Sequence, residues 1–288
     1  MTAPVITRFV GAGGLTLVAD CLGDAGAPPV IFLHGGGQTR GSWRRSLPIV
    51  AERGYRAIAY DARGHGDSDW DRDGDYHLES YAADLAAIVT QLDRPPIFVG
   101  ASLGGLTALL LTGEARHRVA EALVLVDVAP RVNQQGIDRI LKFMAANPDG
   151  FGSLDEAADA VASYNPHRAR PASSHGLAAN LRQRGERLYW HWDPAFLNNR
   201  REDRFALSER IENAARNIAV PTLLIHAGKS DVVTVEEVAH LRQIMPNCHH
   251  NEVPAAGHMI AGDANDAFNS AILEFLATPP LSQTAPLQ

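Results

Sequence analysis

The sequence predicts an α/β protein built around a mostly parallel β-sheet. Short apolar runs of strand length alternate with stretches of helical spacing between Val30 and Asp127, and this alternation resumes after residue 219. The apolar runs are continuous, which is typical of strands that are covered on both faces. Strands and helices in strict turn imply right-handed crossovers, with ligands bound at the carboxyl ends of the strands.

The overall composition narrows the possible functions. The chain has 288 residues and a net charge of −7, whereas proteins that bind a phosphate backbone are usually basic. No apolar stretch approaches the ~20 residues that span a bilayer, and the N-terminus lacks the pattern of a secretory signal. Two cysteines, Cys21 and Cys248, are too few for a disulfide framework. We therefore expect a cytoplasmic protein with neither nucleic-acid nor membrane partners.

The first part of the chain predicts a strand hairpin followed by alternating strands and helices. A glycine-rich turn at residues 11–14 separates the two strands of the hairpin. The elements expected up to Asp127 lie at residues 8–10, 15–21, 30–33, 43–53, 56–60, 78–92, 97–99, 103–112 and 122–126.

The segment at residues 131–218 lacks any convincing strand pattern. Apolar residues recur at helical spacing from Ile137 to Met144, and Ser153 begins a capping-box pattern for a further helix. Other helices are expected at 177–184 and 205–215. We therefore expect a core domain formed by 1–130 and 219–288, with a helical cap at 131–218 inserted after the sixth strand.

The alternating pattern returns at the end of the chain. A strand at 222–226, a helix at 235–244, a short strand at 249–253 and a closing helix at 264–276 are expected. These additions bring the predicted sheet to eight strands.

The segment Gly100-Ala101-Ser102-Leu103-Gly104 follows an apolar run and precedes helix-forming residues. A serine in a sharp turn between a strand and a helix needs small neighbours two residues away on each side, and Gly100 and Gly104 meet this need. The following helix places the N–H of Leu103 and a positive dipole end near the hydroxyl. The pattern predicts that Ser102 is a nucleophile.

A serine nucleophile needs a base, and the base needs an orienting acid. His258, in a loop after the last short strand, is the best-placed histidine. Asp231 follows the strand that comes after the insertion and is the favoured acid, although it is also placed to cap the helix that begins near Thr234. Asp127, at the end of an earlier strand, is the alternative acid.

Five ordered motifs resemble those of α/β-hydrolase fold proteins of the esterase, lactonase and haloperoxidase-like branch. They span residues 34–258 and comprise His34-Gly35-Gly36-Gly37, the segment 61–68, the segment 100–104, Asp231, and Gly257-His258. The resemblance implies the order serine, acid, histidine for the catalytic residues. It also implies an oxyanion hole formed by the N–H groups of Gly36 and Leu103. His34 is then a structural hydrogen-bonding residue, and 61–68 is a scaffold turn.

The inserted segment is rich in large aromatic side chains. Most of them are expected to pack in the core, but Trp190, His191, Trp192 and Phe143 are candidates for binding a hydrophobic or aromatic part of a small-molecule substrate. We expect no metal and no cofactor. His249 and His250 are adjacent on a strand and point to opposite faces, so they cannot easily chelate one ion. The sequence does not distinguish a monomer from a homodimer.

The interpretation that follows is a serine hydrolase acting on a small carboxylic ester or lactone through an acyl-enzyme on Ser102. One alternative keeps this site but uses it for hydrolytic C–C cleavage or for cofactor-free oxygenation. Another is a catalytically weak ligand receptor.

Overall fold

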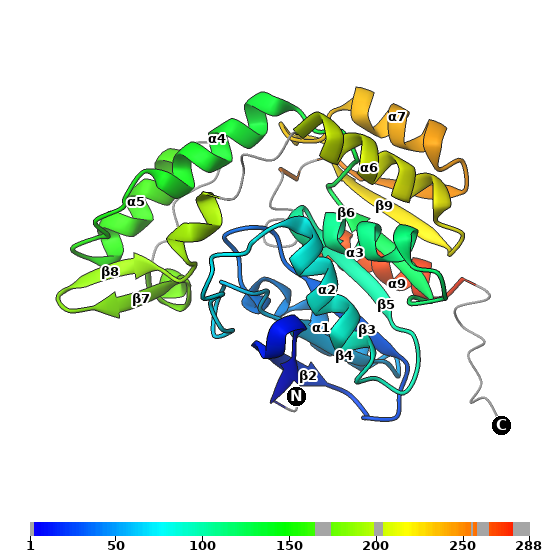
Figure 1. The fold of residues 1–288 in the computed structure, drawn as a ribbon, viewed down its shortest axis with the longest axis horizontal. Helices are drawn as coiled ribbons and strands as arrows, with labels where there is room; N and C mark the ends of the chain where they lie inside the picture. The colour runs from blue at the N-terminus through cyan, green and yellow to red at the C-terminus, as the bar shows by residue number, and fades with distance from the viewer. Residues whose placement is uncertain (1–2, 165–173, 199–203, 255, 258–264, 279–288) are drawn as a thin grey trace.

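The organising element of the structure is an eight-stranded sheet (Figure 1). The structure is a computed structural model that describes residues 3–164, 174–198, 204–254, 256–257 and 265–278. The strand order is β1-β2-β4-β3-β5-β6-β9-β10, in which β2 pairs antiparallel with both β1 and β4 and all other pairs are parallel. The strands are β1 (Val5–Val10), β2 (Thr16–Leu22), β3 (Pro29–Leu33), β4 (Arg56–Tyr60), β5 (Ile97–Ala101), β6 (Ala122–Val126), β9 (Thr222–Ala227) and β10 (Cys248–Val253). The predicted mostly parallel eight-stranded sheet is confirmed.

Helices cover both faces of this sheet. They are α1 (Ser46–Ala51), α2 (Leu78–Val89), α3 (Leu103–Glu114), α7 (Val235–Ile244) and α9 (Asn265–Leu276). Successive strand residues point to opposite faces, so Ile31 packs in the same core as α2 and α3, whereas Phe32 packs in the same core as α1 and α9. This double covering explains why β3, β5 and β6 contain no polar side chain.

The helix expected at 43–53 is shorter than predicted. A 3₁₀ turn spans Arg40–Trp43, and α1 begins only at Ser46. Pro48 supplies the reason, because a proline is tolerated in the first turn of a helix but clashes with the carbonyl four residues earlier when it lies inside one.

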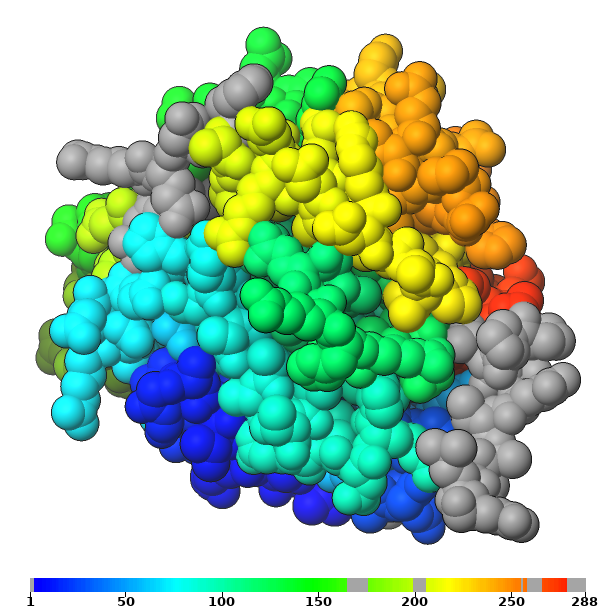
Figure 2. Space-filling view, turned by 45° about the vertical axis from the view of Figure 1, so that its right-hand side comes forward, coloured from blue at the N-terminus to red at the C-terminus, as the bar shows by residue number. Residues whose placement is uncertain are grey.

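The part of the chain between β6 and β9, which we call the insertion, holds α4 (Gln134–Ala145), α5 (Leu154–Tyr164) and α6 (Arg204–Asn217). Helix α6 packs against α3, and both are visible on the face in Figure 2. The approach is close, because a Cβ added at Gly113 would lie 2.1 Å from the carbonyl oxygen of Ala214.

The expectation that the insertion contains no strand is wrong. A two-stranded hairpin of β7 (Leu181–Arg184) and β8 (Arg187–Trp190) replaces the second half of the helix expected at 177–184. Gly185, with φ of 60°, begins the two-residue turn, because a glycine at positive φ matches the twist of the two strands. Phe151 adds a bridge to Leu188. No helix within the described residues is long and apolar enough to cross a membrane.

Candidate active site

The carboxyl ends of β5, β6, β9 and β10 meet at one edge of the sheet. The strand registers pair Ala101 with Val126, and Ala227 with Val253. Between them, the N–H of Asp127 donates to the carbonyl of Ile225 at 2.8 Å. The segments that follow these four strands therefore lie side by side.

Ser102 occupies a sharp turn at this edge, between β5 and α3. Its backbone has φ of 47° and ψ of −116°, a conformation that costs a non-glycine residue about 1–3 kcal/mol. A Cβ added at Gly100 would lie 2.6 Å from the carbonyl oxygen of Gly104, and one added at Gly104 would lie 2.5 Å from that of Leu33. The expectation that both positions need glycine is confirmed.

Leu103 is the first residue of α3. The first N–H groups of a helix have no intrahelical acceptor, and they carry the positive end of the helix dipole. The first bond of the helix runs from the N–H of Leu106 to the carbonyl of Ser102 at 2.9 Å. The N–H of Leu103 therefore belongs to the positive end of the helix, beside Ser102.

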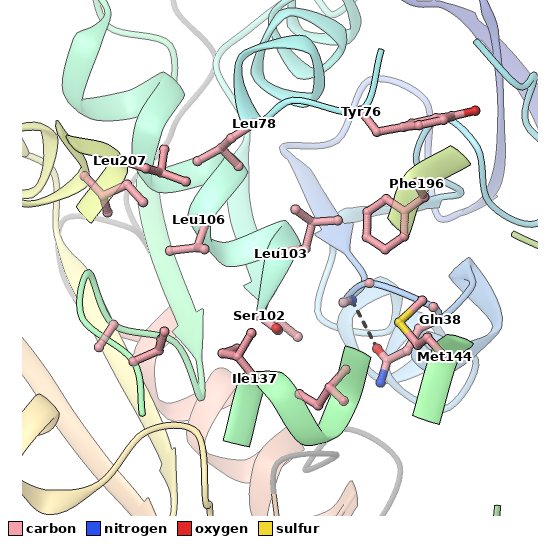
Figure 3. A pocket seen from close by; sticks show the side chains of 18 of the residues that line it. Gln38, Tyr76, Leu78, Ser102, Leu103, Leu106, Ile137, Met144, Phe196 and Leu207 are labelled. Atoms are coloured by element: carbon pink, nitrogen blue, oxygen red, sulfur yellow. Dashed lines mark hydrogen bonds between the residues drawn. The ribbon is translucent and has the colours of Figure 1, made fainter. Parts of the chain in front are cut away.

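The loop at residues 34–38, which we call the glycine loop, faces Ser102. A Cβ added at Gly35 would lie only 3.4 Å from the Cβ of Ser102. The N–H of Gly35 donates to Oε1 of Gln38 at 3.1 Å (Figure 3). The carbonyl of Gly35 accepts from the N–H of Gln38 at 3.1 Å and from Nδ1 of His34 at 2.8 Å.

Both backbone groups of Gly37 are also bound. Its N–H donates to Nε2 of His65 at 3.1 Å, and its carbonyl accepts from Nε2 of His191 at 3.2 Å. Of the glycine N–H groups in the loop, only that of Gly36 has no hydrogen-bond partner among the described residues. Gly36 lines the cavity that contains Ser102.

His34 is a structural residue, as predicted. Its Nε2 accepts from the N–H of Ala62 at 3.0 Å while Nδ1 donates to the glycine loop. Burial lowers the pKa of His34 to about 4, because a buried imidazolium loses its hydration. The ring therefore stays neutral at physiological pH.

The turn at residues 61–68 is a scaffold, also as predicted. The hydroxyl of Ser68 donates to the carbonyl of Asp61 at 2.6 Å and accepts from the N–H of Val18 at 2.9 Å. Arg63 pairs with the buried carboxylate of Asp84 through two bonds of 2.7 and 2.8 Å. These contacts fix the turn to β2 and α2.

The two candidate acids lie in different surroundings. Asp127 is fully buried, and its carboxylate accepts from the N–H of Ala227 at 3.0 Å and from the hydroxyl of Ser230 at 2.6 Å. Asp231 lies in the loop that Asp127 anchors. Its half-exposed carboxylate forms an ion pair with Arg139 of α4. Asp231 does not cap the following helix, because Thr234 and Glu237 form the capping box there.

His258 lies outside the described residues. The structure does describe the segment that precedes His258. This segment is hydrogen-bonded to the loop that carries Asp231. The N–H of Gly228 donates to the carbonyl of Val253 at 3.0 Å, and that of Lys229 donates to the carbonyl of Ala256 at 2.9 Å. The loop after β9 and the segment after β10 therefore lie against each other as far as Ala256.

Ser102 opens onto a cavity of about 1150 Å³ beneath the insertion (Figure 3). Leu106, Ile137, Met144 and Leu207 are among its apolar walls. This volume slightly exceeds the range of about 300–1,000 Å³ that is usual for small-molecule sites, so the cavity has room for a ligand with a large apolar part.

Three of the four aromatic residues singled out in the insertion line this cavity, namely Phe143, Trp190 and Trp192. The rings of Trp190 and Trp192 stack at 5.0 Å. The expectation that His191 faces the cavity is wrong. Both nitrogens of its buried ring bind backbone groups of Gly37 and Gly66, because adjacent residues of an extended segment point in opposite directions.

Sequence reasoning missed two further residues of the wall. Tyr164 stacks on Phe143 with ring centroids 4.4 Å apart. Gln38 lines the cavity and accepts a hydrogen bond from the N–H of Gly35 in the glycine loop. A polar residue directly after three glycines was the available signal for Gln38. Tyr164 gave none, because its place depends on how α5 packs.

The described residues contain no group of three or more His, Cys, Asp or Glu side chains arranged to hold a metal ion. The ring of His249 lies 6.4 Å from that of Phe275, whereas the ring of His250 lies 6.0 Å from that of His226. The two neighbouring histidines therefore contact different partners.

The fold and the serine turn define an α/β enzyme with a pocket at the carboxyl edge of its sheet. The alpha/beta hydrolase fold family matches residues 28–264, and the chain belongs to this family. It is 30% identical over 273 residues to the sn-1-specific diacylglycerol lipase ABHD11 of Mus musculus, covering 88% of this chain and 83% of the relative.

Esterase Rv0045c of Mycobacterium tuberculosis is 31% identical over 244 residues, which cover 82% of this chain and 78% of the esterase. The crystal structure of E-2-(acetamidomethylene)succinate hydrolase superposes with a TM-score of 0.83 at 22% identity, over 96% of this chain and all of that one, and shows the shared fold. With relatives named as a lipase and an esterase, the chain is an enzyme of the hydrolase class.

Proposed function

We propose that the protein is a serine hydrolase that cleaves a small carboxylic ester or lactone. The observation that carries this proposal is the surroundings of Ser102. A serine in a strained turn lies at a cavity, between the first residue of a helix and the glycine loop. Of the three glycine N–H groups in that loop, only that of Gly36 lacks a partner among the described residues. A pair of fixed N–H donors beside a nucleophile is what acyl transfer requires.

In the proposed reaction, Oγ of Ser102 attacks the carbonyl carbon of the substrate while His258 takes the proton from Oγ. The N–H groups of Leu103 and Gly36 stabilise the oxyanion that forms. Collapse of this intermediate expels the alcohol, which receives the proton from His258. A water molecule, deprotonated by the same histidine, then releases the acid and regenerates Ser102.

Asp231 is the acid that we assign to orient His258. One carboxylate oxygen of Asp127 binds Ala227 at the end of β9 and the other binds Ser230 in the loop that follows, which gives Asp127 a structural task. Asp231 lies further along that loop, which is bonded to the chain just before His258. The order serine, acid, histidine is also that of other hydrolases with this fold.

The lining of the cavity favours a substrate with a hydrophobic or aromatic part. The stacked pairs Trp190 with Trp192 and Phe143 with Tyr164 offer flat apolar surfaces. Such surfaces stabilise aromatic or extended acyl groups by burial, at roughly 25 cal/mol per Å² of apolar area.

The test uses a panel of p-nitrophenyl esters together with covalent labelling by an organophosphonate. We expect the wild-type protein to turn over the esters and to be labelled, and Ser102→Ala to lose both. Ser163→Ala is the matched control, because within the described part of the chain the exposed Ser163 hydroxyl bonds only to the carbonyl of Asp159 in its own helix, α5. Turnover that survives in Ser102→Ala would exclude the serine mechanism.

A further inference from the structure

Three buried imidazoles lie close together beside the glycine loop. The ring of His65 is 5.2 Å from that of His34 and 5.8 Å from that of His191. They come from three separate parts of the chain: His34 follows β3, His65 lies in the scaffold turn, and His191 belongs to the insertion. None of the three is more than 2% exposed.

Each imidazole binds a different peptide group of the glycine loop. The Nδ1 of His34 donates to the carbonyl of Gly35, Nε2 of His65 accepts from the N–H of Gly37, and Nε2 of His191 donates to the carbonyl of Gly37. These atoms belong to three consecutive peptide planes, between residues 35 and 36, 36 and 37, and 37 and 38. Because each peptide is planar, holding one of its atoms fixes the direction of the others.

The first plane carries the N–H of Gly36, whose direction is opposite to that of the Gly35 carbonyl. The other two planes determine whether the first can rotate. Gly37 has φ of 76°, and a Cβ there would lie 3.0 Å from Cε of Met144. A glycine segment with such conformational freedom keeps one orientation only when its neighbouring peptides are held.

The hydrogen bonds also define the protonation of each ring. Nδ1 of His191 accepts from the N–H of Gly66 at 2.9 Å, so the proton is on Nε2. His65 accepts at Nε2 and donates from Nδ1 to the carbonyl of Arg63 at 2.9 Å, and His34 also accepts at Nε2. Each ring accepts a backbone N–H at one of its nitrogens, so all three rings are neutral. Burial, followed by the nearby rings of His65 and His34, also lowers the pKa of His191 well below its usual value.

We propose that His191 is a positioning residue through which the insertion holds the glycine loop in its oxyanion-binding geometry. This inference rests on the proposed function and extends it. His191 touches neither the cavity nor the reacting atoms. It fixes the third peptide plane of the loop and ties that plane to Gly66, so the oxyanion site is complete only when the insertion is docked on the core.

A purely structural role would predict a different outcome. If His191 only attached the insertion to the core, then weakening another contact of the same hairpin would have the same effect. Arg184 offers this control, because its guanidinium stacks over the ring of Trp70 at 4.9 Å, outside the cavity and away from the glycine loop.

The first experiment compares kcat and KM for a p-nitrophenyl ester among three variants. His191→Phe keeps a ring of similar size but loses both hydrogen bonds, and we expect kcat to fall about tenfold or more while KM changes less than twofold, because oxyanion donors act mainly in the transition state. His191→Gln retains a donor and an acceptor and is expected to recover most of kcat. Arg184→Gln is expected to keep the wild-type kcat.

Affinity for a boronic acid, which forms a tetrahedral adduct with a serine, is expected to fall in parallel with kcat in His191→Phe. Folded His191→Phe with kcat within twofold of wild type would overturn the inference. An equal loss of kcat in Arg184→Gln would also overturn it, because attachment of the insertion alone would then explain the effect.

The second experiment needs no variant and covers the case in which His191→Phe does not fold. The ¹⁵N shifts of the imidazoles in wild-type protein report their tautomers at pH 7.5. We expect Nε2–H for His191 and Nδ1–H for His34 and His65. A charged ring or the opposite tautomer at His191 would overturn the inference.

The two proposals fail in distinguishable ways. If turnover does not depend on Ser102, the proposed function and the role of His191 are both wrong. If turnover depends on Ser102 but not on His191, only the present inference is wrong.

Discussion

The strained backbone of Ser102 leads to a prediction about stability that is independent of any substrate. Ser102→Ala and Ser102→Gly both remove the nucleophilic oxygen, but only glycine adopts φ of 47° with ψ of −116° without steric cost. We therefore expect both variants to be inactive and the glycine variant to be the more stable of the two.

The magnitude follows from two opposing contributions. Relief of the backbone strain contributes about 1–3 kcal/mol to the free energy of unfolding. The greater freedom of glycine in the unfolded chain removes about 0.4–1 kcal/mol of it. The net difference is about 1 kcal/mol in favour of Ser102→Gly, or a melting temperature about 2 °C higher for a domain of this size.

Urea denaturation of the two variants, monitored by circular dichroism, measures this difference. The control is Ala101→Gly in the Ser102→Ala background. Ala101 is the last residue of β5 and does not have a positive φ. Glycine at this position is therefore expected to lower the free energy of unfolding by roughly 0.5–1 kcal/mol. Equal or lower stability of Ser102→Gly relative to Ser102→Ala would refute the idea that the turn stores strain.

Three further predictions follow. Asp231→Asn is expected to lower kcat about 10³-fold or more, and far more than Asp127→Asn; the reverse ranking in steady-state kinetics would reassign the acid. Because burial lowers the pKa of His34 to about 4 from 6.5, wild-type protein should lose up to about 3 kcal/mol of unfolding free energy relative to His34→Gln as the pH falls through this interval. Denaturation at pH 7.5 and 4.5 tests this, and equal pH dependence would contradict it. Gly104→Ala places a Cβ 2.5 Å from a backbone oxygen of β3, so it should destabilise the fold by about 1–3 kcal/mol and abolish labelling by the organophosphonate. Gly176→Ala is the control and should do neither, because a Cβ at residue 176 has no atom within 4 Å.

Elements that depend on neighbouring residues were predicted well. The strands at 56–60 and 122–126 and the helix at 235–244 begin and end where the sequence indicates. Continuous apolar runs and capping residues are local signals, and each is sufficient to define its element. The glycines around Ser102 are equally local, because the turn that requires them is five residues long.

The insertion was harder to predict, because its patterns are ambiguous. Leu177 and Leu181 have the spacing of a helix face, yet Leu181 begins the strand β7, which pairs with β8. Strand β8 in turn gains Phe151 as a further neighbour, at Leu188. Tertiary packing overrides a short periodic pattern in such a segment. His191 was misplaced for the same reason, since the direction of its side chain depends on where β8 lies.

By itself, the sequence determined the order of the strands and helices outside the insertion, the serine turn and the two candidate acids. Each of these depends on periodicity or on backbone conformation within a few residues. The tertiary structure alone decided which groups surround Ser102. The bond from His191 to Gly37 joins residues 154 positions apart, and the bond from Gly66 to His191 joins residues 125 apart. No local pattern encodes such contacts. They exist because the sheet and the insertion bring buried polar groups together, where each one must find a hydrogen-bond partner.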